Sequence, residues 1–149
     1  MSKTSHPLYT YLMFAGALPF LISAVLLALG IHTLPFLKNV QHLVSVYGLV
    51  IASFIAGAHW GQHFIPQHSK VSLLLISSNV YALLLWISYL VLPLPQFFLA
   101  LITLFMLLLW VDTVLYRAQE ISTHYFYIRC IISGIVIASL AMIYFISHH

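Results

Sequence analysis

The chain has 149 residues, of which 63% are hydrophobic and only 5% are charged. A soluble domain would carry about 25% charged residues, so this composition excludes a soluble globular protein, and its apolar content excludes a disordered one. The formal net charge of +3 is spread over single basic residues between apolar runs. This pattern excludes a nucleic-acid-binding surface, which would need clustered basic residues.

Five apolar segments are long enough to cross a membrane as helices, which takes about 20 residues each. We predict spans at 8–29, 42–64, 71–91, 96–116 and 125–146. Turn-forming residues, among them Gly30, Pro66 and Pro93, separate these segments. The short connections predict that neighbouring helices pack antiparallel, in a single all-α bundle that forms one domain over 1–149.

The first segment contains Pro19 shortly after Gly16. A proline inside a helix removes a backbone hydrogen bond and clashes with the preceding turn. We therefore predict a kink between these two residues.

Basic residues predict the orientation of the bundle. Lys3, Lys70 and Arg117 fall on one side of the predicted spans, whereas Lys38 falls on the other. The positive-inside rule then places the N-terminus in the cytoplasm and the C-terminus outside.

The second segment carries small residues on one broad helical face. They are Gly48, Ala52, Ser53, Ala56, Gly57 and Gly61. Small side chains let helix backbones approach closely in lipid, so we predict that this face packs inside the bundle. A homodimer contact is the alternative, because Ser53, Gly57 and Gly61 repeat at intervals of four residues.

Polar and aromatic residues in four of the segments are candidates for a ligand or ion-pair site. They are His59 and Trp60 in the second segment, Asn79 in the third, Asp112 and Tyr116 in the fourth, and Arg129 in the fifth. Among them, His59, Asn79, Asp112 and Arg129 are expected to face the bundle interior. At about 1.5 Å of rise per residue, His59, Asp112 and Arg129 reach similar depths. Because ionisable groups are expensive in hydrocarbon, we predict an Asp112–Arg129 ion pair. It is either a structural pin between two helices or, with His59, part of a site for a ligand or a proton.

Metal binding has weak support. His59 and His63 share a helical face at i, i+4 spacing, which makes them the weak candidates for ligands. Carboxylates are nearly absent, and Cys130 is the single cysteine, which also excludes an intrachain disulfide. We predict no metal and no cofactor, with haem, quinone or metal as open alternatives.

The stretch Gly16-Ala-Leu-Pro19-Phe20, then Tyr47-Gly48 and His59-Trp60-Gly61, resembles a family of small five-helix inner-membrane proteins of unknown function. This family is widespread in proteobacteria and includes mitochondrial transmembrane protein sixty-nine. Trp86, Asp112, Tyr125 and Arg129 fit the same pattern, whereas His63 and His124 do not belong to it. The resemblance covers nearly the whole chain and implies a bacterial inner membrane, with the mitochondrial inner membrane as the alternative. It implies no function.

The short loops leave mainly helix faces for interaction, so we expect a non-enzymatic scaffold, assembly or lipid-binding factor. The first alternative is a binding or transport module for a small molecule, proton or ion, with His59, Asp112 and Arg129 in the cytoplasmic leaflet. A quinone- or haem-associated membrane subunit is the second. A water-filled pocket that reaches His59 would favour the first alternative, a deep aromatic slot would favour the second, and a dry, filled site would favour the scaffold. Expected partners are membrane lipids and another membrane protein or a second copy of the chain, but not nucleic acids.

Overall fold

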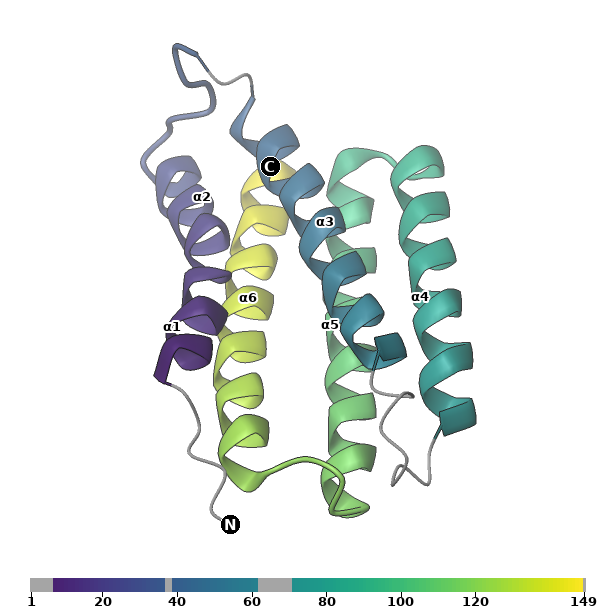
Figure 1. The fold of residues 1–149 in the computed structure, drawn as a ribbon. Helices are drawn as coiled ribbons and strands as arrows, with labels where there is room; N and C mark the ends of the chain where they lie inside the picture. The colour runs from purple at the N-terminus through teal and green to yellow at the C-terminus, as the bar shows by residue number, and fades with distance from the viewer. Residues whose placement is uncertain (1–6, 37–38, 62–70, 149) are drawn as a thin grey trace.

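The computed structural model describes residues 7–36, 39–61 and 71–148. The helices in these residues lie side by side (Figure 1). They are α1 (Pro7–Ala15), α2 (Leu18–Ala28), α3 (Val40–Gly61), α4 (Val71–Val91), α5 (Leu94–Arg117) and α6 (Thr123–His148). Five spans in these residues are long and apolar enough to cross a membrane, with α1 and α2 contributing to one of them. The predicted all-α bundle is thus confirmed. The predicted range 71–91 coincides with α4, and residues 62–64 of the second predicted span lie outside the described residues.

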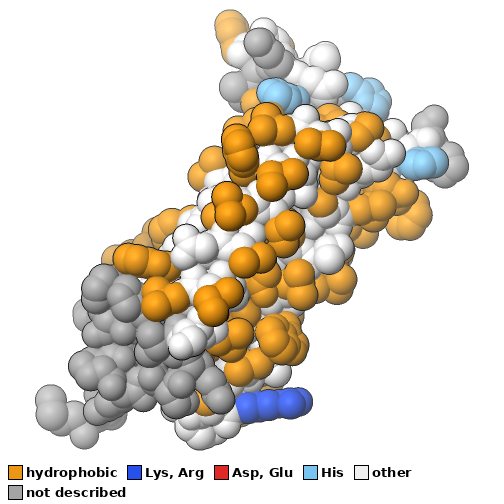
Figure 2. All heavy atoms as spheres, turned by 90° about the vertical axis from the view of Figure 1, so that its right-hand side faces the viewer, with side chains coloured by type: hydrophobic (Ala, Val, Ile, Leu, Met, Phe, Trp, Pro, Cys, Tyr) orange, Lys and Arg blue, Asp and Glu red, His pale blue; other side chains and the backbone are white. Residues whose placement is uncertain are grey.

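Apolar side chains cover the face of the bundle that Figure 2 shows, with a basic side chain at one end and histidines towards the other. This distribution matches a protein whose middle is surrounded by lipid and whose ends meet water. The outward residues of α4 include Ile76, Leu83, Trp86 and Leu90, all of them largely exposed. The structure therefore has the surface expected of a multi-pass membrane protein.

The first span breaks between α1 and α2, at the place where the sequence predicts a kink. Pro19 stands in the first turn of α2, where the lack of a backbone N–H is tolerated. The break leaves the Gly16 carbonyl within reach of α3, and the Tyr47 hydroxyl donates a hydrogen bond to it at 3.0 Å. The kink is thereby tied to the neighbouring helix.

The core is centred on α5, which packs against α3, α4 and α6 and buries the largest share of its residues among the five spans. Phe98, Leu101 and Leu108 on α5 are completely buried. Phe105 meets Phe20 of α2 edge to face, with the ring centroids 5.9 Å apart. Asp112 follows on the same buried face, so the packing that forms the core also places a carboxylate inside it.

The turn between α5 and α6 sets how these two helices lie against each other. After α5 ends, Gln119 adopts a left-handed conformation (φ 60°), and the backbone N–H of Glu120 donates to the Leu115 carbonyl at 2.9 Å. This pattern closes the helix end and reverses the chain within a few residues. Tyr116 then stacks on Phe126 of α6, with parallel rings and centroids 4.5 Å apart.

The small-residue face of α3 is narrower than predicted. Gly48, Ala52 and Ala56, at intervals of four residues, are buried against the bundle. Ser53, Gly57 and Gly61 are exposed instead, and a Cβ atom added at Gly57 or Gly61 would meet open space. We therefore correct the prediction for these three residues. Residues spaced by four form one ridge along a helix, and of the predicted small residues those on this ridge pack against the bundle.

A close approach at Gly48 yields a stability prediction. A Cβ atom at this position would lie 2.7 Å from Cδ1 of Leu101, a completely buried side chain. Overpacking of this kind typically costs about 1–3 kcal/mol. We expect Gly48→Ala to lower the free energy of unfolding relative to Gly57→Ala, which makes the same chemical change on the same helix in open space. Thermal unfolding in detergent measures the difference, and equal midpoints would contradict the close packing at Gly48.

Candidate functional site

A buried carboxylate joins three helices near one end of the bundle. Asp112 on α5 is completely buried, and its Oδ1 lies 2.8 Å from Nε2 of His59 on α3. Its Oδ2 accepts a hydrogen bond from Nε of Arg129 on α6, also at 2.8 Å. His59 and Arg129 are themselves buried. We call these residues the His59–Asp112–Arg129 cluster.

The hydrogen bonds fix the roles of the three side chains. An arginine stays protonated in proteins, and an ionised carboxylate can only accept hydrogen bonds. The ring nitrogen Nε2 of His59 therefore carries a hydrogen and donates it to Asp112. With His59 neutral, the cluster contains one negative and one positive charge, which is the arrangement that lowers the cost of burying ions in a membrane.

The Asp112–Arg129 ion pair is the one predicted from the sequence, and His59 joins it at the same depth. This match follows from simple helix geometry. Asp112 lies near the end of α5, Arg129 near the start of α6, and the short turn between them makes the two helices antiparallel. Side chains at equal distances from such a turn lie at equal depths.

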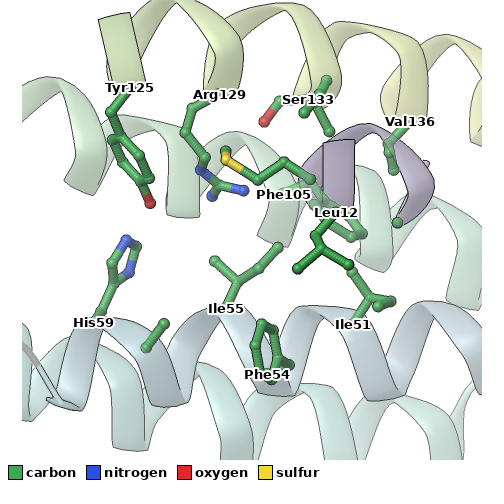
Figure 3. A pocket seen from close by; sticks show the side chains of 14 residues that line it. Leu12, Ile51, Phe54, Ile55, His59, Phe105, Tyr125, Arg129, Ser133 and Val136 are labelled. Atoms are coloured by element: carbon green, nitrogen blue, oxygen red, sulfur yellow. The ribbon is translucent and has the colours of Figure 1, made fainter. Parts of the chain in front are cut away.

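A cavity of about 340 Å³ adjoins the cluster. Its lining residues come from α1, α3, α5 and α6 and from the break after α1, and they are mostly apolar: Leu12, Met13, Gly16, Ile51, Phe54, Ile55, Ala58, His59, Phe105, Tyr125, Arg129, Ile132, Ser133 and Val136. In Figure 3, His59, Arg129 and Tyr125 lie at one end of this space, and Leu12 and Ile51 lie towards the other. The volume falls at the lower end of the range of about 300–1,000 Å³ for small-molecule sites.

Two polar atoms of the cluster are buried without a hydrogen-bond partner among the described residues. They are Nδ1 of His59 and Nη2 of Arg129. Both residues also line the cavity. Leaving a buried polar atom unsatisfied costs about 1–3 kcal/mol, so a polar group bound beside these atoms would recover free energy.

Two other candidate residues of this site, Asn79 and Trp60, have exposed side chains. Asn79 is exposed on α4, and its Nδ2 donates to the Leu75 carbonyl at 2.8 Å. An asparagine amide can thus satisfy itself on its own helix, which removes the need for a partner inside the bundle. Trp60 is 42% exposed, as expected for an aromatic residue near a membrane boundary. We therefore correct the prediction that the Asn79 side chain faces the interior.

Tyr116 lies at the contact between α5 and α6, although it was expected at the ligand or ion-pair site. It is half-buried and stacks on Phe126, and it is absent from the lining of the cavity. The ring therefore supports the α5–α6 contact and does not form part of the cavity wall.

Of the two histidines considered as metal ligands, His59 and His63, the structure describes only His59. His63 lies outside the described residues, so the His59/His63 pair has no structural description. Within the ranges that the structure covers, no group of three or more His, Cys, Asp or Glu side chains is arranged to hold a metal ion. His59 instead forms a hydrogen bond with Asp112 through its Nε2 atom.

The sequence left a cavity beside His59, Asp112 and Arg129 as one alternative, and one further sequence signal points to it. Gly16, at the break before Pro19, is part of the cavity lining. A broken helix leaves room beside neighbouring helices, and such breaks in membrane proteins often line cavities. The apolar wall residues Leu12, Phe54 and Phe105 carry no comparable signal, because their side chains look like any lipid-facing or core residue.

The ion pair yields a second prediction. Asp112→Asn strands the Arg129 guanidinium, and Arg129→Gln strands the Asp112 carboxylate; removal of one partner from a buried pair costs about 3–5 kcal/mol. We expect the double variant to lose less stability than the sum of the two single variants, because it leaves no unpaired ion. Unfolding midpoints of the four proteins in one detergent provide the measurement. Strictly additive losses would mean that the two side chains do not interact.

Comparison with known proteins gives one match. A family model described as "Protein of unknown function (DUF3429)" matches residues 5–145. No curated protein and no solved structure matches the chain. Because the family model spans nearly all of the sequence, including every residue of the cluster and of the cavity wall, the chain belongs to this uncharacterised family, DUF3429.

Proposed function

We propose that this protein binds a small amphipathic molecule inside the membrane. The observation that carries the proposal is the apolar cavity of about 340 Å³, one end of which is formed by His59 and Arg129. Ligand sites typically combine an apolar lining with a few polar groups that fix the orientation of the ligand. Of the functions considered for this sequence, the cavity that reaches His59 supports a binding module or lipid-binding factor best.

The lining of the cavity suggests how a ligand enters. Leu12 and Phe54 both line the cavity, yet they are 62% and 73% exposed. Both lie within membrane-spanning segments. From this exposure we infer that the cavity opens to lipid beside these two side chains, so that a ligand dissolved in the bilayer can reach it without crossing water.

The wall of the cavity also bears on the type of ligand. Aliphatic side chains, such as Ile51, Ile55 and Val136, outnumber the aromatic ones in the lining. A flexible hydrocarbon chain can pack against such a wall, whereas a flat ring system gains most from aromatic surfaces. The lining therefore favours a lipid-like molecule over haem or quinone.

A scaffold or assembly role is a second candidate, favoured by the exposed small residues of α3. Ser53, Gly57 and Gly61 follow one another at intervals of four, and added Cβ atoms at both glycines would meet open space. Small residues at this spacing allow close helix contacts in lipid. The partner is a second copy of the chain or another membrane protein.

We place the protein in the bacterial inner membrane, with the N-terminus in the cytoplasm. The asymmetry of Lys3, Lys70 and Arg117 against Lys38 supports this orientation. The mitochondrial inner membrane is the alternative location that the family resemblance of the sequence implies.

Filling the cavity tests the binding function. Ala58 and Ser53 are both exposed residues of α3, but only Ala58 is part of the cavity lining. We expect native mass spectrometry of gently purified protein to show a bound small molecule in the wild type and in Ser53→Phe. In Ala58→Phe the bound fraction should fall at least about tenfold, because the phenyl ring occupies part of the space, and a loss of roughly 1.4 kcal/mol suffices for this change.

Unfolding midpoints of the two variants control for general damage to the fold. A wild-type protein without a bound molecule, or equal binding by both variants, would contradict the proposal.

A further inference from the structure

We infer that the polar end of the cavity takes the carboxyl group of a long-chain monocarboxylic acid. The inference rests on the proposed binding function and specifies the head group of the ligand. It assigns one contact to Nη2 of Arg129 and one to Nδ1 of His59, the two buried polar atoms for which the described residues provide no partner.

Arg129 is oriented by Asp112 and still has a donor to offer. Its Nε donates to Oδ2 of Asp112 at 2.8 Å, while Oδ1 of the same carboxylate is engaged by His59. Both oxygens of Asp112 are thus in use, and Nη2 is left as a charged donor. A charged N–H donor of this kind binds carboxylate oxygens in short, strong hydrogen bonds.

His59 can exchange a proton with the ligand. Its Nε2–H is held by Asp112, so Nδ1 is a hydrogen-bond acceptor while the ring is neutral. An entering carboxylic acid can donate its O–H to Nδ1 and transfer the proton. The O–H bond breaks, an Nδ1–H bond forms, and the ligand becomes a carboxylate. Its two oxygens then accept hydrogen bonds from His59 Nδ1–H and Arg129 Nη2–H.

This transfer leaves the net charge of the site unchanged. Before it, the charges of Asp112 and Arg129 cancel, and both His59 and the acid are neutral. Afterwards, the added negative charge of the ligand is cancelled by the positive charge of His59. Burial of a net charge in a region of low dielectric constant is expensive, so a neutral acid from the bilayer is a suitable ligand.

Other head groups fit these two contacts less well. An ester carbonyl can accept from Arg129 but has no proton to give to His59. A phosphate monoester brings about −1.5 to −2 charges, which exceeds the single positive charge that His59 can add. An ammonium head group would face the Arg129 guanidinium. The carboxyl group satisfies both atoms and keeps the site neutral.

The test compares oleic acid with methyl oleate, which has the same chain and no acidic proton. Wild-type protein in phosphatidylcholine nanodiscs should bind oleic acid at least about tenfold more tightly, measured by calorimetry, because the ester leaves Nδ1 without a partner. His59→Gln keeps a donor for Asp112 but lacks Nδ1. It should lose the preference for the acid over the ester. Asn79→Ala, on the exposed face of α4, should keep it.

A second measurement needs no variant. The ¹³C carboxyl resonance of labelled oleic acid bound to wild-type protein should have the shift of an ionised carboxylate, since the proton has moved to His59. A protonated carboxyl group in the site would overturn the inference.

The remaining outcomes separate this inference from the proposed function. Equal affinity for acid and ester, or retention of the preference by His59→Gln, would overturn the head-group assignment and leave the binding function intact. Tighter binding of dodecyl phosphate would replace the carboxyl with a phosphate, and equally tight binding of acetate would remove the requirement for a long chain. No binding of any of these probes by the wild type would overturn both the inference and the proposed function.

Discussion

The interaction on which this structure depends is the double hydrogen bond of the Asp112 carboxylate. It is the single acidic side chain within the described membrane-spanning helices, and it is completely buried. One of its oxygens holds His59 of α3, and the other holds Arg129 of α6. A carboxylate at such a position requires partners, because its desolvation is costly. The helices that supply them are therefore fixed in depth and in rotation relative to α5.

The same constraint produces the candidate site. Asp112 accepts hydrogen bonds from Nε of Arg129 and Nε2 of His59. Nη2 of the guanidinium and Nδ1 of the imidazole remain buried without a partner in the described part of the chain. Both residues form part of the cavity wall (Figure 3). Gly16, at the break of the first span, is also part of this wall. The same residues can thus hold the helices together and form part of a binding site. The ion pair that joins the helices also orients the two groups offered to a ligand.

The fold and the charged centre were predictable from the sequence, whereas the direction of some side chains and the extent and apolar lining of the cavity were not. Long apolar runs define the spans, and two opposite charges in hydrocarbon have few other partners, so Asp112 and Arg129 could be paired from depth alone. A helical face of small residues is too broad to show which ridge makes contact, and Gly57 was assigned to the interior for this reason. Asn79 was misplaced because an amide can bond within its own helix. The cavity depends on how several helices pack together, which no single segment encodes.

Solid-state NMR of the protein in lipid bilayers tests the central claim most directly. Asp112 is the single aspartate of the chain, so ¹³Cγ-labelled aspartate gives one carboxyl signal. With ¹⁵N-labelled histidine and arginine, this signal should show dipolar couplings to one imidazole nitrogen and one guanidinium nitrogen, because Oδ1 and Oδ2 each lie 2.8 Å from their partner atom. Arg129→Lys should abolish the arginine coupling, whereas Arg117→Lys should leave it unchanged. Coupling to neither residue, or to only one of them, would contradict an Asp112 carboxylate that holds α3 and α6 together.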